Sequence, residues 1–119
     1  MSDRPADPTP PPDIVLGYAT GWPDGADEPE GQRPYATWGE AGTLLVVTWG
    51  GSRCPQLPIS VEVSDAHTVI IRTELYRPGG PCTRDFVPTT GIVAIPDGLE
   101  RTATVRVRVD DVETVLAPR

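Results

Sequence analysis

From about residue 35 onward, apolar and polar residues alternate along the chain with a period of two. The segment ISVEVS at residues 59–64 is the clearest case, and TVRVRV at residues 104–109 repeats it. This alternation predicts strands that bury one face. The segment LLVVTW at residues 44–49 is apolar at almost every position, which predicts a central strand that is covered on both faces.

Turn-forming residues separate the apolar segments. Ser64-Asp65-Ala66, Pro96-Asp97-Gly98 and Asp110-Asp111 each stand between two of them. Further strands are expected at residues 14–16, 35–38, 69–73, 83–87, 92–95 and 112–116. This spacing predicts an all-β fold, a small antiparallel β-sandwich of roughly seven to nine strands.

The N-terminal segment has a different character. Residues 1–13, MSDRPADPTPPPD, contain five prolines and three aspartates but a single large apolar side chain, Met1. Such a segment cannot bury enough apolar surface to offset the entropy lost on ordering. We expect a disordered, proline-rich tether over residues 1–13, followed by one β-sandwich domain over residues 14–119.

Composition and charge add two constraints. Fifteen prolines and twelve glycines among 119 residues oppose long helices. The net charge of the chain is −7. Residues 1–40 hold eight acidic side chains and two arginines, whereas residues 41–119 hold nine acidic and eight basic side chains. Most of the net negative charge therefore lies in residues 1–40. Four of the eight acidic residues there lie in residues 21–34, GWPDGADEPEGQRP, which we expect to form a solvated loop rather than a calcium site. Nucleic-acid binding is not expected, because it needs clustered cations.

The basic residues point to the source and, indirectly, to the compartment. All ten are arginine, and the chain has no asparagine, which indicates the codon bias of a GC-rich genome such as that of an actinobacterium. No signal peptide is visible, and the longest apolar run, residues 44–47, is too short to cross a bilayer. An acidic, proline-rich tether favours a domain that is exported or anchored upstream of this chain, with a cytosolic location as the alternative.

Cys54 and Cys82 lie 28 positions apart, each in a loop rich in proline and glycine. A zinc site needs four ligands, and the chain has one histidine; a redox pair is usually C-x-x-C, which is absent. The favoured interpretation is a disulfide between two loops, and a free nucleophilic thiol is the alternative. Closing a loop of this length stabilises a fold by about 3.5 kcal/mol.

Other residues are candidates for contact or chemistry. Tyr76 and Arg77 begin a stiff loop, YRPGGP, that we expect to be exposed and available for binding. His67 could join a catalytic set with a cysteine or an aspartate, but a solvated hairpin histidine is favoured. The three tryptophans are interpreted as core or loop-anchoring side chains.

Two segments carry a resemblance to small uncharacterised actinobacterial envelope proteins. These are SRCPQLPISVEV at residues 52–63 and PCTRDFVPTT at residues 81–90. In the proteins that they resemble, a cysteine pair joins strands of an immunoglobulin-like sandwich, often behind a lipoprotein or membrane anchor. The resemblance implies a fold and an exported location, and no known activity.

A second resemblance lies in VPTTGI at residues 87–92. It is similar to the N-P-T-T-G-aromatic loop of chagasin-like cysteine-peptidase inhibitors, although Val87 replaces the asparagine and Ile92 the aromatic residue. This resemblance implies that Pro88, Thr89, Thr90 and Gly91 form an inhibitory loop.

The sequence therefore favours a non-enzymatic, extracytoplasmic interaction module that contacts a protein or another envelope component through its end loops. A chagasin-like inhibitor is the first alternative, and a cytosolic protein with free thiols and an unknown enzymatic activity is the second. No cofactor and no metal are expected. The sequence leaves the partner and the oligomeric state open.

Overall fold

The computed structural model describes residues 10–23, 33–40, 42–79, 81–100 and 102–118. The predicted tether therefore lies outside the described residues up to position 9, and the predicted acidic loop does so over positions 24–32. Among the described residues, no helix is long and apolar enough to cross a membrane.

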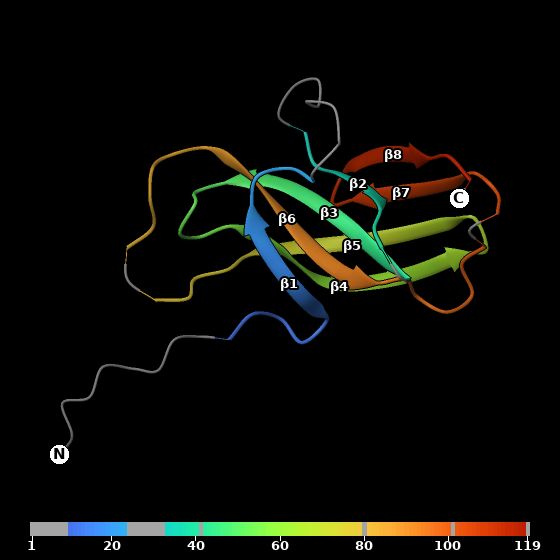
Figure 1. Cartoon of the computed structure of the whole chain (residues 1–119), viewed down its shortest axis with the longest axis horizontal. Coiled ribbons are helices and arrows are strands. Elements are labelled where there is room, and N and C mark those ends of the chain that lie inside the picture. Colours follow the sequence, from blue (N-terminus) through green and yellow to red (C-terminus); the bar gives the residue numbers. More distant parts are fainter. Residues whose placement is uncertain (1–9, 24–32, 41, 80, 101, 119) are drawn as a thin grey trace, which may run out of the picture.

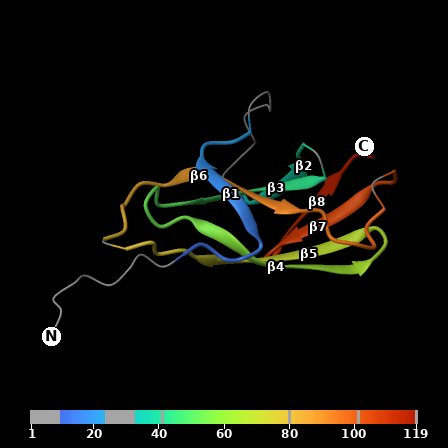
Figure 2. The same ribbon diagram turned by 60° about the horizontal axis from the view of Figure 1, so that its bottom comes forward.

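Two four-stranded sheets lie face to face (Figure 1). The first has the order β1-β6-β3-β2 and the second β4-β5-β7-β8. Figure 2 separates the two layers. The strands within the described ranges are β1 (Val15–Thr20), β2 (Tyr35–Trp38), β3 (Thr43–Gly50), β4 (Gln56–Asp65), β5 (Thr68–Leu75), β6 (Val87–Ala94), β7 (Val105–Val109) and β8 (Val112–Leu116). The predicted small all-β sandwich is confirmed.

The core lies between the two sheets and follows the period-two pattern. In β7, the three valines are buried and the two arginines between them are exposed. Other strands also place every second side chain in the core, because successive side chains of a strand point to opposite faces. The resulting cluster consists of Ala36, Leu44, Val46, Val69, Ile71, Val93, Val105, Val107, Val109 and Leu116.

One strand pair departs from the antiparallel arrangement that the sequence predicted. β5 and β7 pair in parallel, with Thr68 opposite Arg106 and Ile71 opposite Val109. The strand between them in the chain, β6, belongs to the other sheet. The chain therefore runs back along the opposite layer before β7 begins, and β7 takes the same direction as β5.

Asp110 ends the parallel pairing. It has a positive φ of 53° in the turn between β7 and β8, a conformation that aspartate tolerates better than most residues. Its N–H donates to the carbonyl of Ile71 at 2.8 Å. Its carboxylate accepts the N–H of Thr73 at 2.9 Å. The carboxylate thus supplies a partner for β5 immediately beyond the end of β7.

Of the strand predicted at residues 83–87, only Val87 lies in a strand, and the loop that the chagasin-like resemblance implied at residues 88–91 is not formed. Residues 88–91 lie within β6, between β1 and β3. Pro88 fits this central strand because its carbonyl accepts the N–H of Gly21 at 2.8 Å, so its backbone groups face the side of β1. The carbonyl of Gly21, which an N–H at position 88 would face, accepts the hydroxyl group of Thr90 instead at 2.7 Å, so the proline leaves no acceptor unpaired there.

Candidate functional site

At one end of the sandwich, two connections between the sheets are bonded to each other. We call their described residues the pinned loops: residues 51–55 join β3 to β4, and residues 76–79 and 81–86 belong to the connection from β5 to β6. Cys54 and Cys82 form a disulfide across them, with their Cα atoms 5.3 Å apart. This confirms the predicted disulfide. The alternative of free thiols is contradicted, because both cysteines are in this bond.

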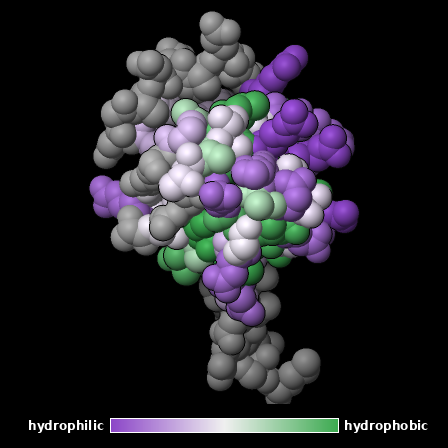
Figure 3. All heavy atoms as spheres, turned by 90° about the vertical axis from the view of Figure 1, so that its right-hand side faces the viewer, coloured by the Kyte–Doolittle hydropathy of each residue, from purple (hydrophilic) through white to green (hydrophobic). Residues whose placement is uncertain are grey.

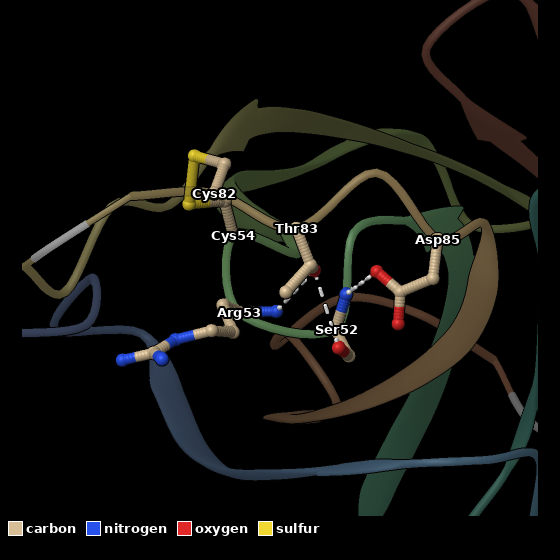
Figure 4. The surroundings of a disulfide bond; sticks show 6 residues. All are labelled: Ser52, Arg53, Cys54, Cys82, Thr83 and Asp85. Carbon is tan, nitrogen blue, oxygen red and sulfur yellow. Dashed lines mark hydrogen bonds between the residues drawn. A yellow bond between two sulfur atoms is a disulfide. The ribbon is translucent and has the colours of Figure 1, made fainter.

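Hydrogen bonds join the same two loops beside the disulfide (Figure 4). The N–H of Ser52 donates to Oδ1 of Asp85 at 3.0 Å. Oγ1 of Thr83 accepts the N–H of Arg53 at 3.3 Å and lies 3.2 Å from Oγ of Ser52. Gly51 permits this approach, since a Cβ at that position would lie 2.8 Å from the carbonyl oxygen of Thr83. The loops are therefore held together both by a covalent bond and by a polar network.

Asp85 is the charged member of this network. Hydrogen bonds from the Ser52 side chain, the Thr83 side chain and the Ser52 backbone lower the pKa of its carboxyl group from 3.8 to about 2. Hydrogen bonds donated to a carboxylate favour its ionised form. Asp85 is consequently a carboxylate throughout the physiological pH range.

Ser52→Ala should raise the pKa of Asp85 from about 2 toward 3.8, because it removes the largest cause of the shift. A pH titration of the side-chain carboxyl carbon by NMR measures this. Since the folded-state pKa is lowered, the carboxylate contributes stability above about pH 4, and the contribution is lost as the pH falls through about 2. Ser64→Ala, at the far end of β4, is the matched control. An unchanged Asp85 pKa in Ser52→Ala would contradict this account.

Tyr76 does not have the exposed position that the sequence suggested. Its side chain is only 8% exposed. Its N–H donates to the carbonyl of Pro55 at 2.8 Å, and its ring lies edge-on to that of Tyr18, with 5.8 Å between the centroids. Burial raises the pKa of its hydroxyl group. Tyr76 therefore anchors the second pinned loop to the sandwich, whereas the neighbouring Arg77 is exposed as predicted.

Three exposed residues of the pinned loops were missed by the sequence analysis. Arg53 and Arg84 are exposed, and the ring of Phe86 is 54% exposed. The Arg53 side chain extends away from Thr83 and Asp85 (Figure 4). The sequence signal was present, because each lies near a cysteine in a loop rich in proline and glycine. What was lacking was the knowledge that the two loops meet.

The other predicted contact residues lie on β6. Thr89 and Gly91 are buried toward the core, whereas Pro88 and Thr90 face outward. The hydroxyl group of Thr90 donates to the carbonyl of Gly21 at 2.7 Å. Thr90 also lines an open groove of about 1020 Å³ on the outer face of the first sheet, together with Gly17, Trp22, Leu45 and Ile92. These residues form a strand surface, and the loop predicted by the chagasin-like resemblance is absent from this position.

His67 lies at the opposite end of the sandwich, in the turn between β4 and β5. Its Nε2 is 3.7 Å from a carboxylate oxygen of Glu100, and its backbone N–H donates to Asp65 at 2.8 Å. Figure 3 shows this end, where hydrophilic side chains gather around a smaller apolar area. The length of β4 separates His67 from Cys54, so the two do not form a catalytic pair. Among the described residues, no three histidine, cysteine or acidic side chains are grouped to hold a metal.

Comparison with protein-family models, with curated proteins and with solved structures finds no match to this chain.

Proposed function

We propose that this protein is a non-enzymatic, extracytoplasmic β-sandwich module that binds a partner through the pinned loops. The observation that carries the proposal is the double attachment of these loops. A disulfide and three polar contacts hold them at one end of the fold, where Arg53, Arg77 and Phe86 are exposed.

Ordering a flexible loop upon association reduces affinity, so loops that are already fixed lose less entropy. Arginine and aromatic side chains are also enriched among the residues that contribute most to protein interfaces. Loops presented by a rigid sheet scaffold are a common location for binding. The pinned loops combine all three properties.

The disulfide supports the extracytoplasmic part of the proposal. Stable disulfides persist in oxidising compartments and are rare in the cytosol. Cys54 is only 2% exposed whereas Cys82 is exposed, so the bond ties an exposed loop residue to the packed structure. These properties favour an exported domain.

The non-enzymatic part rests on the arrangement of the reactive groups. Both cysteines are bonded to each other, and His67 faces Glu100 rather than a nucleophile. The inhibitor alternative lacks its loop, because residues 88–91 belong to a central strand. Binding is therefore the function best supported by the described residues.

Site-specific photo-crosslinking tests this function. We expect benzoylphenylalanine in place of Phe86 to form a discrete adduct with one protein in an envelope extract of the source organism. The matched control is the same substitution at Val115, which is 62% exposed on β8, far from the pinned loops. Adducts formed equally at both positions, or at Val115 alone, would rule out the pinned loops as the binding site.

A further inference from the structure

The pinned loops carry a local positive charge in an acidic protein. They contain three arginines, Arg53, Arg77 and Arg84, and one acidic residue, Asp85, whereas the whole chain has a net charge of −7. All three arginines are exposed. Within the described part of the chain, the single ion pair is that of His67 with Glu100, so the three guanidinium groups have no carboxylate partner there.

Asp85 offsets one of these three positive charges, but within the described residues it forms no ion pair with any of the arginines. It accepts the N–H of Ser52, and hydrogen bonds from Ser52 and Thr83 hold its pKa low. Asp85, the only acidic side chain of the pinned loops, is thus hydrogen-bonded to Ser52 and Thr83. The three guanidinium groups remain available to a partner. The surface is also not purely electrostatic, since Phe86 presents an exposed ring beside Arg84 and Asp85 in the chain.

The number of cations distinguishes the classes of anionic partner. Basic clusters that hold a protein on anionic membranes contain about four to eight lysines or arginines, and nucleic-acid binding also relies on many phosphate contacts. Three arginines are too few for either. They suit a few carboxylates, which arginine binds in a planar, bidentate geometry. Aromatic residues and arginine are both enriched at protein interfaces.

We infer that the pinned loops bind an acidic segment of a partner protein, through Arg53, Arg77 and Arg84 with Phe86 as the apolar contact. This inference rests on the proposed function and names the chemistry of the partner. The net negative charge of the chain does not oppose it strongly, because at physiological salt the field of an exposed charge is screened over about 8 Å.

Fluorescence anisotropy tests the inference with the full chain and a short fluorescein-labelled peptide that alternates glutamate with tyrosine. We expect Arg53→Gln, Arg77→Gln and Arg84→Gln together to weaken binding about tenfold or more. The matched control replaces three exposed arginines of β5 and β7, with Arg72→Gln, Arg106→Gln and Arg108→Gln, and should change binding less than about twofold. A peptide with glutamine in place of glutamate should not bind. Melting temperatures of both triple variants verify that the fold is intact.

Three results of the peptide experiment would overturn the inference, and so would one result with the crosslinked protein. The three are equal weakening by the two triple variants, equal binding of the glutamine peptide, or binding to vesicles of phosphatidylserine and phosphatidylcholine in place of the acidic peptide. If Phe86 crosslinks to a protein but the arginine variants bind that protein as well as the wild type, the chemistry assigned to the partner fails and the proposed function stands. If no crosslink forms at Phe86, the proposed function itself fails.

Discussion

Replacing Cys54 and Cys82 together with alanine is expected to lower the free energy of unfolding by about 3.5 kcal/mol. The disulfide closes a loop with a sequence separation of 28 residues, and without it the unfolded chain regains that freedom. For a domain of about 100 residues, this loss corresponds to a fall in melting temperature of about 15–25 °C. Alanine is preferred to serine because Cys54 is buried, and a serine hydroxyl there would add a separate cost.

Thermal and urea unfolding followed by circular dichroism measure this effect. The matched control is the wild-type protein in a reducing agent that breaks the bond, which should unfold in the same range as the double variant. The reducing agent should have no further effect on the variant. A double variant that unfolds within a few degrees of the oxidised wild type would show that the two loops stay together without the bond.

Gly91→Val is expected to destabilise the fold by about 3 kcal/mol, the upper part of the usual range for overpacking. Gly91 faces the core where β6 approaches β4, and a Cβ there would lie 3.1 Å from Cδ of Pro58. The proline ring cannot rotate away from a new side chain, so the two sheets would have to separate locally.

Urea denaturation of the two purified variants measures this difference. The matched control is Gly17→Val, also in the first sheet, where a Cβ would meet only Cδ1 of Ile92 at 3.9 Å and where the residue lines the open groove. We expect this control to change the free energy of unfolding by less than about 1 kcal/mol. Equal losses in the two variants would mean that the backbone of these strands, rather than the close approach of β6 to β4, requires glycine.

The strands that bury one face were predictable, because their pattern is local. β7 is the clearest example, with buried valines and exposed arginines in strict alternation. Residues 88–91 were not, since proline, two threonines and glycine are typical of a turn. Their place in β6 depends on two tertiary facts that local propensity cannot supply: how Gly21 pairs with Pro88 and Thr90, and how closely β4 approaches Gly91.

The candidate site was predictable in part for the same reason. The disulfide followed from the number and setting of the cysteines, and the exposure of Arg77 from its loop. The burial of Tyr76 depends on Tyr18 and Pro55, which are distant in the chain. The roles of Arg53, Arg84 and Phe86 depend on the meeting of two loops that the sequence alone does not bring together.

The parallel pairing of β5 with β7 has a consequence for how the chain folds. The β4–β5 and β7–β8 hairpins join neighbouring segments, so they can form quickly. The parallel pair joins residues that are far apart in the chain, such as Thr68 and Arg106, and β6 must first cross to the opposite sheet. Pairing over such a separation loses chain entropy before any contact compensates for it. We therefore expect the closing of β7 against β5 to limit the folding rate, with the two hairpins already formed at the barrier.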